Sequence, residues 1–238
     1  MCGRYASTRS AADLAELFGV EDLTEGDLVP DYNLAPTDPA PIVLAAPNAP
    51  DVGALRVARW GFLPPWSRDA SGAARMINAR AETVATSRAF GEAFARRRCL
   101  VPADGWYEWR VNGSGLKQPY FMTRPGQVAF GGVWSRWGSG DQSRITFSII
   151  TMPAAGQFSF VHHRMPLLLD ESLWADWLAG SEPMTLLTPP TPEYCEGFEI
   201  RPVSPAVGDV RKDGPELLRR VTVGDVDLST VDSAPTLF

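Results

Sequence analysis

CLVPADGWYEWRV, residues Cys99–Val111, is the stretch that decides the fold. Its first part, Cys99–Pro102, is a short apolar run typical of a buried strand, and in Trp106–Val111 the side chains alternate as they do in a strand with two different faces. Further strands are predicted at Tyr120–Thr123, Val128–Trp134 and Ile145–Thr151, with turns at Asn112–Gly115 and Pro125–Gly126. The stretch therefore begins a series of strands joined by short turns.

The elements predicted outward from this series are short. Ser10 is a helix N-cap and Gly19 a helix end, and the apolar residues between them share one face. The other helices are predicted within Ser87–Arg97 and at Glu171–Ala179, a long loop at Trp60–Ala74, and strands near Ile42–Ala45, Leu55–Trp60 and Phe198–Val203. No βαβ alternation is present. The expected fold class is α+β, a single domain with a mainly antiparallel, barrel-like β core and peripheral helices.

Composition narrows the class of protein. At 238 residues the chain has the size of one large domain. No run of about 18 apolar residues is present to span a membrane, and the first residues lack the apolar core of a signal peptide, so we expect a cytoplasmic protein. Three cysteines are too few and too scattered for a disulfide framework or a zinc site. We expect no metal, no cofactor and a monomer, with Cys99 buried in the core.

The basic residues can be interpreted in two ways. A net charge of −6 argues against general polyanion binding by the whole surface. Lys117 and Lys212 are the only lysines among 22 basic residues, so 20 are arginines. Arginine is suited to bidentate phosphate recognition, but a GC-rich genome produces the same bias.

Cys2 has an unusual chemical position. Removal of Met1, which is normal before a small residue, would leave a 1,2-aminothiol whose amine and thiol have pKa values near roughly 8 and 8.5. An aldehyde can form an imine with this amine, and the thiol can then close a thiazolidine ring. A cysteine here is also compatible with an N-terminal nucleophile amidotransferase, although no further glutamine-site motif is present, with a thiol protease, or with no function at all.

Three further segments hold candidate proton-transfer or binding groups. His162 and His163, the only histidines, can titrate near neutrality, and Arg164 directly after them can bind a phosphate. Glu108 is predicted on one strand face with Trp106 and Arg110, where desolvation would raise its pKa, although a solvated glutamate is an equal alternative. In the segment Met76–Thr83, Asn78, Arg80 and Glu82 share one face if the chain is extended.

Together these segments resemble the SRAP family, named for SOS-response-associated peptidases. The matching motifs, in order, are MCGRY at Met1–Tyr5, YNLAP at Tyr32–Pro36, WGFLPPW at Trp60–Trp66, NARAET at Asn78–Thr83, CLVPADGWYEW at Cys99–Trp109, HHRMP at His162–Pro166 and PVSPAVGDVRKDGPEL at Pro202–Leu217. The resemblance covers 1–217, which is the expected domain, and leaves 218–238 as a C-terminal extension, expected to be partly flexible.

The resemblance implies an abasic-site processing protein that senses abasic sites in single-stranded DNA. Cys2 would form the covalent thiazolidine crosslink, assisted by Asn78, Glu108 and His162. Arg4, Arg80 and Arg164 would hold phosphates, and Pro36, Trp66, Trp109 and Thr151 would line the DNA groove. Two departures from the family pattern are Ser67, where a second tryptophan is common, and His163, where an acidic residue is common.

Three hypotheses follow for the function. The leading one is covalent shielding of abasic DNA during the damage response, with the protein associated with the nucleoid while bound. The second is a thiol-dependent peptidase, limited to self-processing or acting on other peptides. The third is a DNA-binding module that forms no covalent bond.

Overall fold

The computed structural model describes residues 2–46, 49–111, 113, 115–140 and 143–222. Of the predicted extension 218–238, the part from 223 onward lies outside the described residues. The strands are β1 (Tyr5–Ser7), β2 (Val20–Asp22), β3 (Asp31–Leu34), β4 (Pro39–Ala46), β5 (Ala49–Trp60), β6 (Asn78–Arg80), β7 (Arg98–Val111), β8 (Lys117–Trp137), β9 (Arg144–Pro153), β10 (Arg164–Pro166) and β11 (Glu199–Pro202). The α-helices are α1 (Ala11–Phe18), α2 (Gly91–Arg96), α3 (Trp174–Ala179) and α4 (Pro192–Glu196).

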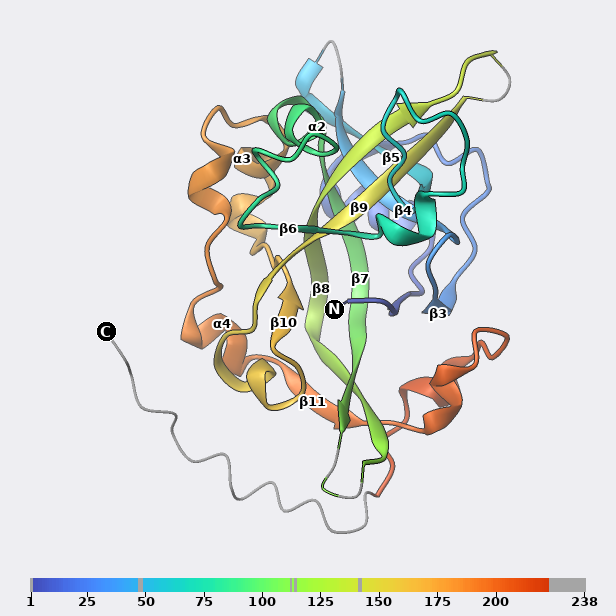
Figure 1. The fold of residues 1–238 in the computed structure, drawn as a ribbon, viewed down its shortest axis with the longest axis vertical. Helices are drawn as coiled ribbons and strands as arrows, with labels where there is room; N and C mark the ends of the chain where they lie inside the picture. Colours follow the sequence, from blue (N-terminus) through green and yellow to red (C-terminus); the bar gives the residue numbers. More distant parts are fainter. Residues whose placement is uncertain (1, 47–48, 112, 114, 141–142, 223–238) are drawn as a thin grey trace.

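Five of the strands close into a ring. β4 pairs with β5 and β7, β5 with β9, β9 with β8, and β8 with β7, so the sheet returns to its starting strand. The helices lie around this ring rather than within it (Figure 1). The predicted α+β domain with a barrel-like core is therefore confirmed. Most pairings are antiparallel, but β5–β9, β6–β9 and β2–β5 are parallel.

β7 and β8 correct the predicted strand boundaries. The two strands expected within Cys99–Val111 are one strand, and a bulge between Ala103 and Gly105 joins them. The bulge requires glycine, because a Cβ atom on Gly105 would lie 2.3 Å from the carbonyl oxygen of Met122. The turn predicted at Pro125–Gly126 is wrong, since β8 runs through both residues. Residues 112 and 114 of the turn predicted at Asn112–Gly115 are outside the described residues.

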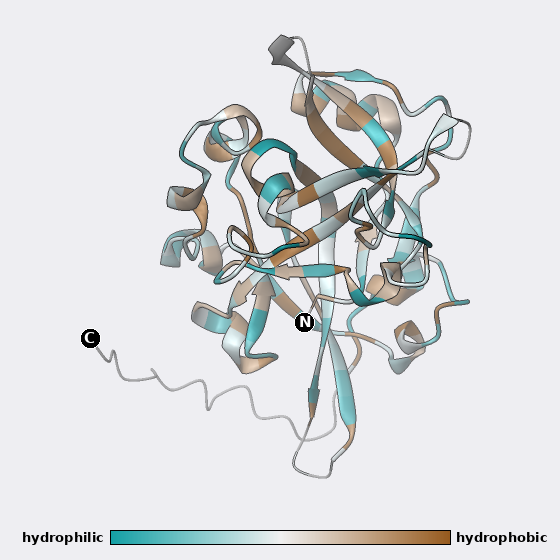
Figure 2. Cartoon of the chain, turned by 45° about the horizontal axis from the view of Figure 1, so that its top comes forward, coloured by the Kyte–Doolittle hydropathy of each residue, from teal (hydrophilic) through white to brown (hydrophobic). Residues whose placement is uncertain are grey.

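The interior of the ring is packed with aromatic side chains. Trp106 and Phe130 meet edge to face with ring centroids 6.0 Å apart, and Tyr5 and Trp60 do so at 5.1 Å. Hydrophobic residues concentrate in the middle of the sheet, whereas the β7–β8 hairpin that extends beyond it is largely hydrophilic (Figure 2). Cys99 is fully buried among these side chains, as predicted.

The helices differ in how well their ends were predicted. α1 begins after the N-cap Ser10, whose hydroxyl accepts from the Asp13 N–H, and ends at Gly19 in the left-handed conformation, as expected. α2 occupies only the second half of Ser87–Arg97. The helix expected at Glu171–Ala179 is shorter, because Asp170 caps a 3₁₀ turn, Glu171–Leu173, before α3 begins.

One buried cation fixes the ends of α2 and α3 against the barrel. Arg98, 5% exposed, donates from its guanidinium group to the carbonyl oxygens of Phe94, Ala95, Trp177 and Gly180. The last carbonyls of a helix have no partner within the helix, and a cation beside them is favourable. Arg98 thus donates hydrogen bonds to carbonyl oxygens at the C-terminal ends of both α2 and α3.

Two short strands were not predicted in this form. β3 lies within the YNLAP motif and pairs with β1, whose other neighbour is β7. β6 pairs in parallel with β9, so that Asn78 lies opposite Ile149 and Arg80 opposite Thr151. Figure 1 shows β6 crossing in front of the barrel, above the N-terminus. These pairings bring the MCGRY, NARAET and GWYEW segments to the same part of the molecule.

Candidate functional site

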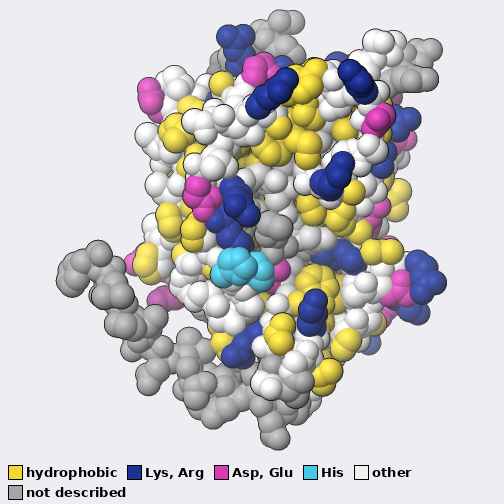
Figure 3. All heavy atoms as spheres, viewed as in Figure 1, with side chains coloured by type: hydrophobic (Ala, Val, Ile, Leu, Met, Phe, Trp, Pro, Cys, Tyr) yellow, Lys and Arg dark blue, Asp and Glu magenta, His cyan; other side chains and the backbone are white. Residues whose placement is uncertain are grey.

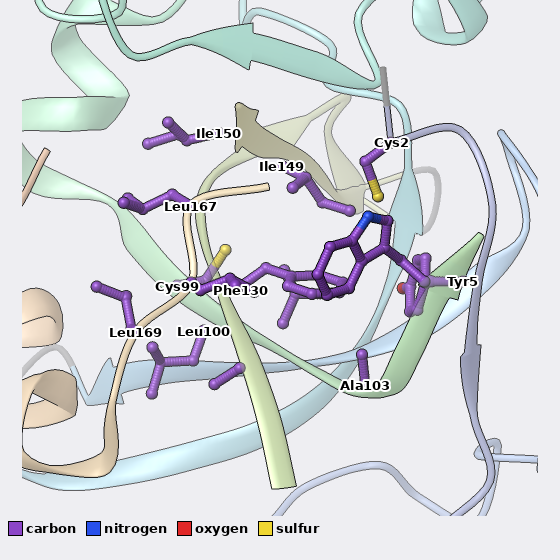
Figure 4. Packing of buried hydrophobic residues seen from close by; sticks show 14 of the residues in the cluster. Cys2, Tyr5, Cys99, Leu100, Ala103, Phe130, Ile149, Ile150, Leu167 and Leu169 are labelled. Atoms are coloured by element: carbon purple, nitrogen blue, oxygen red, sulfur yellow. The ribbon is translucent and has the colours of Figure 1, made fainter. Parts of the chain in front are cut away.

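Cys2 lies at the barrel interior rather than on the surface. β1 begins three residues later and pairs with β7 at Tyr5 and Trp106, which holds the start of the chain against the sheet. The Cys2 side chain is fully buried and belongs to the apolar core, where its sulfur points toward the packed side chains (Figure 4). Burial, and secondarily the charge of Glu108, raises the pKa of the Cys2 thiol far above its ordinary value. The thiol is therefore protonated at neutral pH.

Asn78 connects β6 to Cys2. Its Nδ2 donates to the backbone carbonyl oxygen of Cys2 at 2.8 Å, so the side chain fixes the main chain at Cys2. Its Oδ1 is buried and, among the described residues, accepts no hydrogen bond. A buried amide oxygen without a donor is costly unless a ligand supplies one. Asn78 therefore holds Cys2 through Nδ2, and its Oδ1 can accept a hydrogen bond from a ligand.

Glu108 and His162 come together from different parts of the chain. Glu108 projects from β7 and is 4% exposed, and burial raises the pKa of its carboxyl group. His162 follows the 3₁₀ turn Gly156–Phe160, and its Nδ1 lies 3.9 Å from Oε1 of Glu108. A carboxyl group with a raised pKa thus lies next to an imidazole.

His162 is held by the backbone of its neighbour Arg164. Nδ1 of His162 lies 3.0 Å from the Arg164 backbone nitrogen and 3.1 Å from the Arg164 carbonyl oxygen, so it accepts from the first or donates to the second according to the tautomer. Burial lowers the pKa of His162. The ring of His163 packs against that of His162, with centroids 4.3 Å apart, and is itself exposed.

The predicted alternation along Gly105–Trp109 is confirmed. Trp106 lies in the main core, and Arg110, on the same face, stacks over the ring of Phe160 at 3.8 Å. Tyr107 is buried on the opposite face in a smaller core, against which Trp109 packs, half-buried. Glu108 is the buried carboxylate of the inner face. The alternative of a solvated strand glutamate is therefore wrong.

Arg164 is held in place by two acceptors. It pairs with Glu82, which is 46% exposed at its side chain, and donates to the carbonyl oxygen of Thr151 at 2.6 Å. Thr151 is fully buried, so within the fold it fixes Arg164 rather than facing solvent. Arg80 is exposed at the end of β6. Figure 3 shows the two histidines near the middle of one face, with lysine and arginine side chains above and below them.

The remaining predicted DNA contacts differ in accessibility. Trp66 is 55% exposed, and Pro36 and Ser67 are half-buried. Arg4 is 8% exposed, and its NH1 donates to Oδ1 of Asn33 at 2.7 Å and to the Val207 carbonyl oxygen at 2.8 Å. Arg4 is therefore committed to internal contacts, and its role as a phosphate ligand stays a prediction.

The predicted site residues fall into two groups in the structure, and two residues that hold them were not predicted. The structure brings together Cys2, Asn78, Glu108 and His162, and sets Trp66 and Pro36 apart on surface loops. It adds Glu82 and Asn33, which hold Arg164 and Arg4. The shared strand face of Asn78, Arg80 and Glu82 was the available signal for Glu82. No comparable signal pointed to Asn33.

Other kinds of site find no support within the described residues. No group of three or more histidine, cysteine or acidic side chains there is arranged to hold a metal ion. In the same part of the chain, no helix is long and apolar enough to cross a membrane.

Comparison with known proteins agrees with the motif resemblance. The family model described as SOS response associated peptidase (SRAP) matches residues 1–210. The abasic site processing protein YedK of Escherichia coli is 33% identical over 234 residues, covering 93% of this chain and 100% of its own length. YoqW of Bacillus subtilis is 31% identical over 224 residues, covering 92% and 99%. HMCES of Gallus gallus is 30% identical over 271 residues, covering 94% and 79%.

Solved structures show the same fold. A crystal structure of a protein from Bacteroides thetaiotaomicron superimposes with a TM-score of 0.81 at 24% identity, covering 93% of this chain and 100% of the other. A phage-related protein from Bordetella bronchiseptica gives a TM-score of 0.66 at 27% identity, covering 85% and 94%. The family match, the curated relatives and the barrel with its N-terminal cysteine agree: this chain belongs to the SRAP family.

Proposed function

We propose that this protein captures abasic sites in single-stranded DNA as a covalent thiazolidine on Cys2, after Met1 has been removed. The observation that carries the proposal is the hydrogen bond from Asn78 to the Cys2 carbonyl oxygen, made within the site that also contains Glu108 and His162. Relatives named abasic site processing proteins support the lesion class. The crosslink shields the lesion while the DNA-damage response proceeds.

The reaction joins the aminothiol to the aldehyde of the ring-opened abasic sugar. The α-amine of Cys2 attacks C1′ and forms a carbinolamine, whose hydroxyl group leaves as water when an acid protonates it. The thiol then adds to the carbon of the protonated imine, and its proton passes to the carboxylate of the group that acted as the acid. One C–N and one C–S bond form and one water is lost, so neither oxidant nor reductant is required.

Glu108 supplies and receives the proton in these steps. Because burial raises the pKa of its carboxyl group, Glu108 keeps its proton to a higher pH than an exposed glutamate does, and the protonated form can protonate the carbinolamine oxygen. The resulting carboxylate then accepts a proton when the thiol closes the ring. The high pKa of the Cys2 thiol favours the order in which the amine reacts first, because a neutral thiol is a poor nucleophile.

His162 and Asn78 prepare the two reactants. A ring N–H of His162 is the donor that assists opening of the sugar at O4′, which exposes the aldehyde. Asn78 orients the Cys2 main chain, and its buried Oδ1 is available to accept from the new α-amine or from the carbinolamine hydroxyl.

The DNA is held by phosphate contacts and by stacking. Arg80 is exposed, and Arg164 is fixed beside it by Glu82. Binding of phosphates by these guanidinium groups should weaken as salt rises. Exposed Trp66 can stack on a base, which has little sequence preference, so the aldehyde sets the specificity.

Incubation with a single-stranded oligonucleotide carrying one abasic site tests the proposal. Wild-type protein, with Met1 removal verified by mass spectrometry, should give an adduct that survives heating in denaturant. Cys2→Ala should give none, and Cys2→Ser should give only an imine that must be trapped by borohydride. Cys195→Ser, at a buried cysteine outside the site, is the matched control and should react like wild type. A heat-stable adduct from Cys2→Ala would exclude the thiazolidine.

The family description favours a second candidate, a peptidase using the same thiol. It requires cleavage of a peptide bond other than the one after Met1. Mass spectrometry of a peptide library incubated with wild type and Cys2→Ala decides this: cleavage only by wild type supports the peptidase, and no cleavage restricts it to self-processing. A non-covalent DNA-binding module predicts the same DNA binding by Cys2→Ala and no adduct that survives denaturation.

A further inference from the structure

A pocket lined by arginines lies at the end of β9 opposite to Thr151. Its volume is about 430 Å³. It is lined by four arginines from three strands, Arg56 and Arg59 of β5, Arg136 of β8 and Arg144 of β9, together with Glu25, Asp27, Thr37 and Ser143 among others. Four arginines and two acidic residues thus line one pocket, in a chain whose net charge is −6.

The pocket exists because β5 changes its partner. β5 pairs with β2 at Gly53–Leu55 and with β9 at Arg59–Trp60. Between these pairings, residues 56–58 pair only with β4 on their other edge, within the described part of the chain. The sheet is therefore open along a short length of β5, and the arginines surround this opening. Backbone groups along an unpaired edge are available to a polar ligand.

The arginines have unused hydrogen-bonding capacity. Arg136 donates to Ser143 Oγ at 3.3 Å, and among the described residues none of the four forms a salt bridge with Glu25 or Asp27. Nε of Arg59 is buried and has no partner there. A buried donor without a partner can be satisfied by a ligand. This cluster is thus equipped to bind an anion with several oxygen acceptors.

Backbone strain concentrates at the same place. Within the described residues, Glu25 (φ 58°) and Thr37 (φ 82°) are the non-glycine residues with positive φ, and both line this pocket. Such conformations are costly and persist where surrounding contacts enforce them, often at binding sites. Thr37 is fixed by donation of its N–H to the Trp60 carbonyl oxygen at 2.8 Å. The pocket wall is therefore preformed rather than loose.

The loop after β5 connects this pocket to the Cys2 site. It starts beside Arg59, carries exposed Trp66, and ends at Asn78. It is anchored along the way, because Trp137, next to Arg136, donates to the Ser67 carbonyl oxygen at 2.9 Å, and Thr146 Oγ1 accepts from the Leu63 N–H at 3.0 Å. Trp66 thus lies on a segment fixed to both β8 and β9, and along the chain this segment runs from Arg59 to Asn78.

We propose that the pocket, called here the β5 arginine pocket, binds backbone phosphates of the same DNA strand several nucleotides to one side of the lesion. The inference rests on the proposed function, since it takes single-stranded DNA as the ligand. From Thr151 to Arg144, β9 spans about 23 Å. A DNA strand that rises about 3.4 Å per nucleotide covers this distance in roughly seven nucleotides. Exposed Arg136 and Arg144 at the mouth suit a long polyanion that enters from the surface.

The test uses oligonucleotides that contain a tetrahydrofuran abasic analogue, which has no aldehyde and so reports only non-covalent binding. We compare a 5-nucleotide probe with the lesion in the centre and two 14-nucleotide probes with the lesion two nucleotides from either end. Fluorescence anisotropy should show that the double variant Arg136→Ser/Arg144→Ser binds one of the two 14-nucleotide probes about 10-fold more weakly than wild type does. The slope of log K against log salt should fall by about 1.4, since each lost contact contributes about 0.7.

The matched control is Arg96→Ser/Arg219→Ser, which changes the net charge equally, from −6 to −8, at exposed arginines outside the pocket. It should bind every probe as wild type does. The 5-nucleotide probe should not distinguish the pocket variant from this control. Equal losses on all probes, or no loss on either long probe, would overturn the proposal.

Two further measurements complete the test. The first distinguishes a pocket for a small phosphate from a pocket for DNA, and the second tests the covalent reaction independently of the pocket. If inorganic pyrophosphate binds the wild-type pocket in calorimetry while probe length has no effect, the pocket serves a small phosphate and the DNA assignment is wrong. Crosslinking of a 5-nucleotide probe with a natural abasic site reports the proposed function alone. Its absence in wild type would refute the covalent reaction, and the length dependence of tetrahydrofuran binding would still test the pocket.

Discussion

Two buried polar regions of this protein are built in opposite ways. Around Arg98, all the guanidinium nitrogens donate, and four carbonyl oxygens at the ends of α2 and α3 accept. Around Cys2, the buried Oδ1 of Asn78 and the Nε atoms of Arg4 and Arg164 have no partner among the described residues. Both regions bury polar atoms, but only the first is fully hydrogen-bonded.

This difference in hydrogen bonding distinguishes a region that stabilises the fold from a region that can bind a ligand. A buried cation with all its nitrogens engaged stabilises one arrangement of its neighbours, and removal leaves several carbonyls unsatisfied. A site that binds a substrate needs acceptors and donors that the fold does not use. The Cys2 region contains buried polar atoms of this kind, which agrees with the function proposed for it. Substitutions in the two regions should therefore affect different measurements.

The largest expected effect is on folding. Arg98→Met should lower the free energy of unfolding by about 3–5 kcal/mol, because four helix-end carbonyls lose their donor. Urea denaturation followed by tryptophan fluorescence measures this. Its neighbour provides the control: Arg97→Met, which removes a surface pair with Glu92, should cost no more than about 1 kcal/mol. Similar losses for both variants would show that the Arg98 contacts are not an anchor.

The next effect is on the reaction and not on folding. Glu108→Gln should slow adduct formation on an abasic oligonucleotide by about 100-fold, because the neutral amide cannot transfer a proton. Single-turnover kinetics on denaturing gels measure the rate. Glu16→Gln, an exposed substitution on α1, is the control and should react like wild type. An unchanged rate in Glu108→Gln would remove the carboxyl group from the mechanism.

A smaller effect is expected where the site meets solvent. Trp66→Ala should weaken binding of a tetrahydrofuran oligonucleotide by about 1–3 kcal/mol, through loss of base stacking, and leave the unfolding midpoint unchanged. Fluorescence anisotropy measures the affinity. Met184→Ala, 56% exposed and outside the proposed DNA path, should bind as wild type does. If both variants bind equally well, Trp66 does not stack on DNA.

The smallest effect is a pH dependence of stability. The folded-state pKa of Glu108 is raised, so the folded protein holds this proton more tightly than the unfolded chain. Its contribution is fully present below the ordinary glutamate pKa and is lost as pH rises through the folded-state value. Urea denaturation at several pH values should show that wild type loses stability over this interval relative to Glu108→Gln. Parallel curves would mean that Glu108 ionises in the folded protein as it does in the unfolded chain.

Local chemistry made much of the fold predictable. Ser10 and Gly19 set the ends of α1 because a capping hydroxyl and a left-handed glycine act within a few residues. The alternation around Glu108 predicted its strand face because side chains in a strand point to opposite sides. The turn at Pro125–Gly126 was wrong because β8 pairs with β7 on both sides of these residues, up to Thr123 and again from Val128, so the strand continues through them.

The candidate site was predictable only in part. Its residues were named through ordered motifs, each of which was weak in isolation. Their burial was not predictable, because it depends on the neighbours that the closed barrel places around them. Arg4 and Thr151 show this: both were expected to meet DNA, and the fold buries them in internal hydrogen bonds.

By itself the sequence determined the chemical groups available, namely an aminothiol precursor at Cys2, a strand carboxylate at Glu108, a histidine pair and an excess of arginine over lysine. It also determined the fold class, through alternation and turn residues. Only the tertiary structure decided that Cys2, Asn78, Glu108 and His162 meet, and that Arg98 anchors helices while the four arginines around β5 surround a pocket. The physical reason is that burial, pKa and hydrogen-bond satisfaction depend on contacts between residues far apart in the chain, which only ring closure of the sheet brings together.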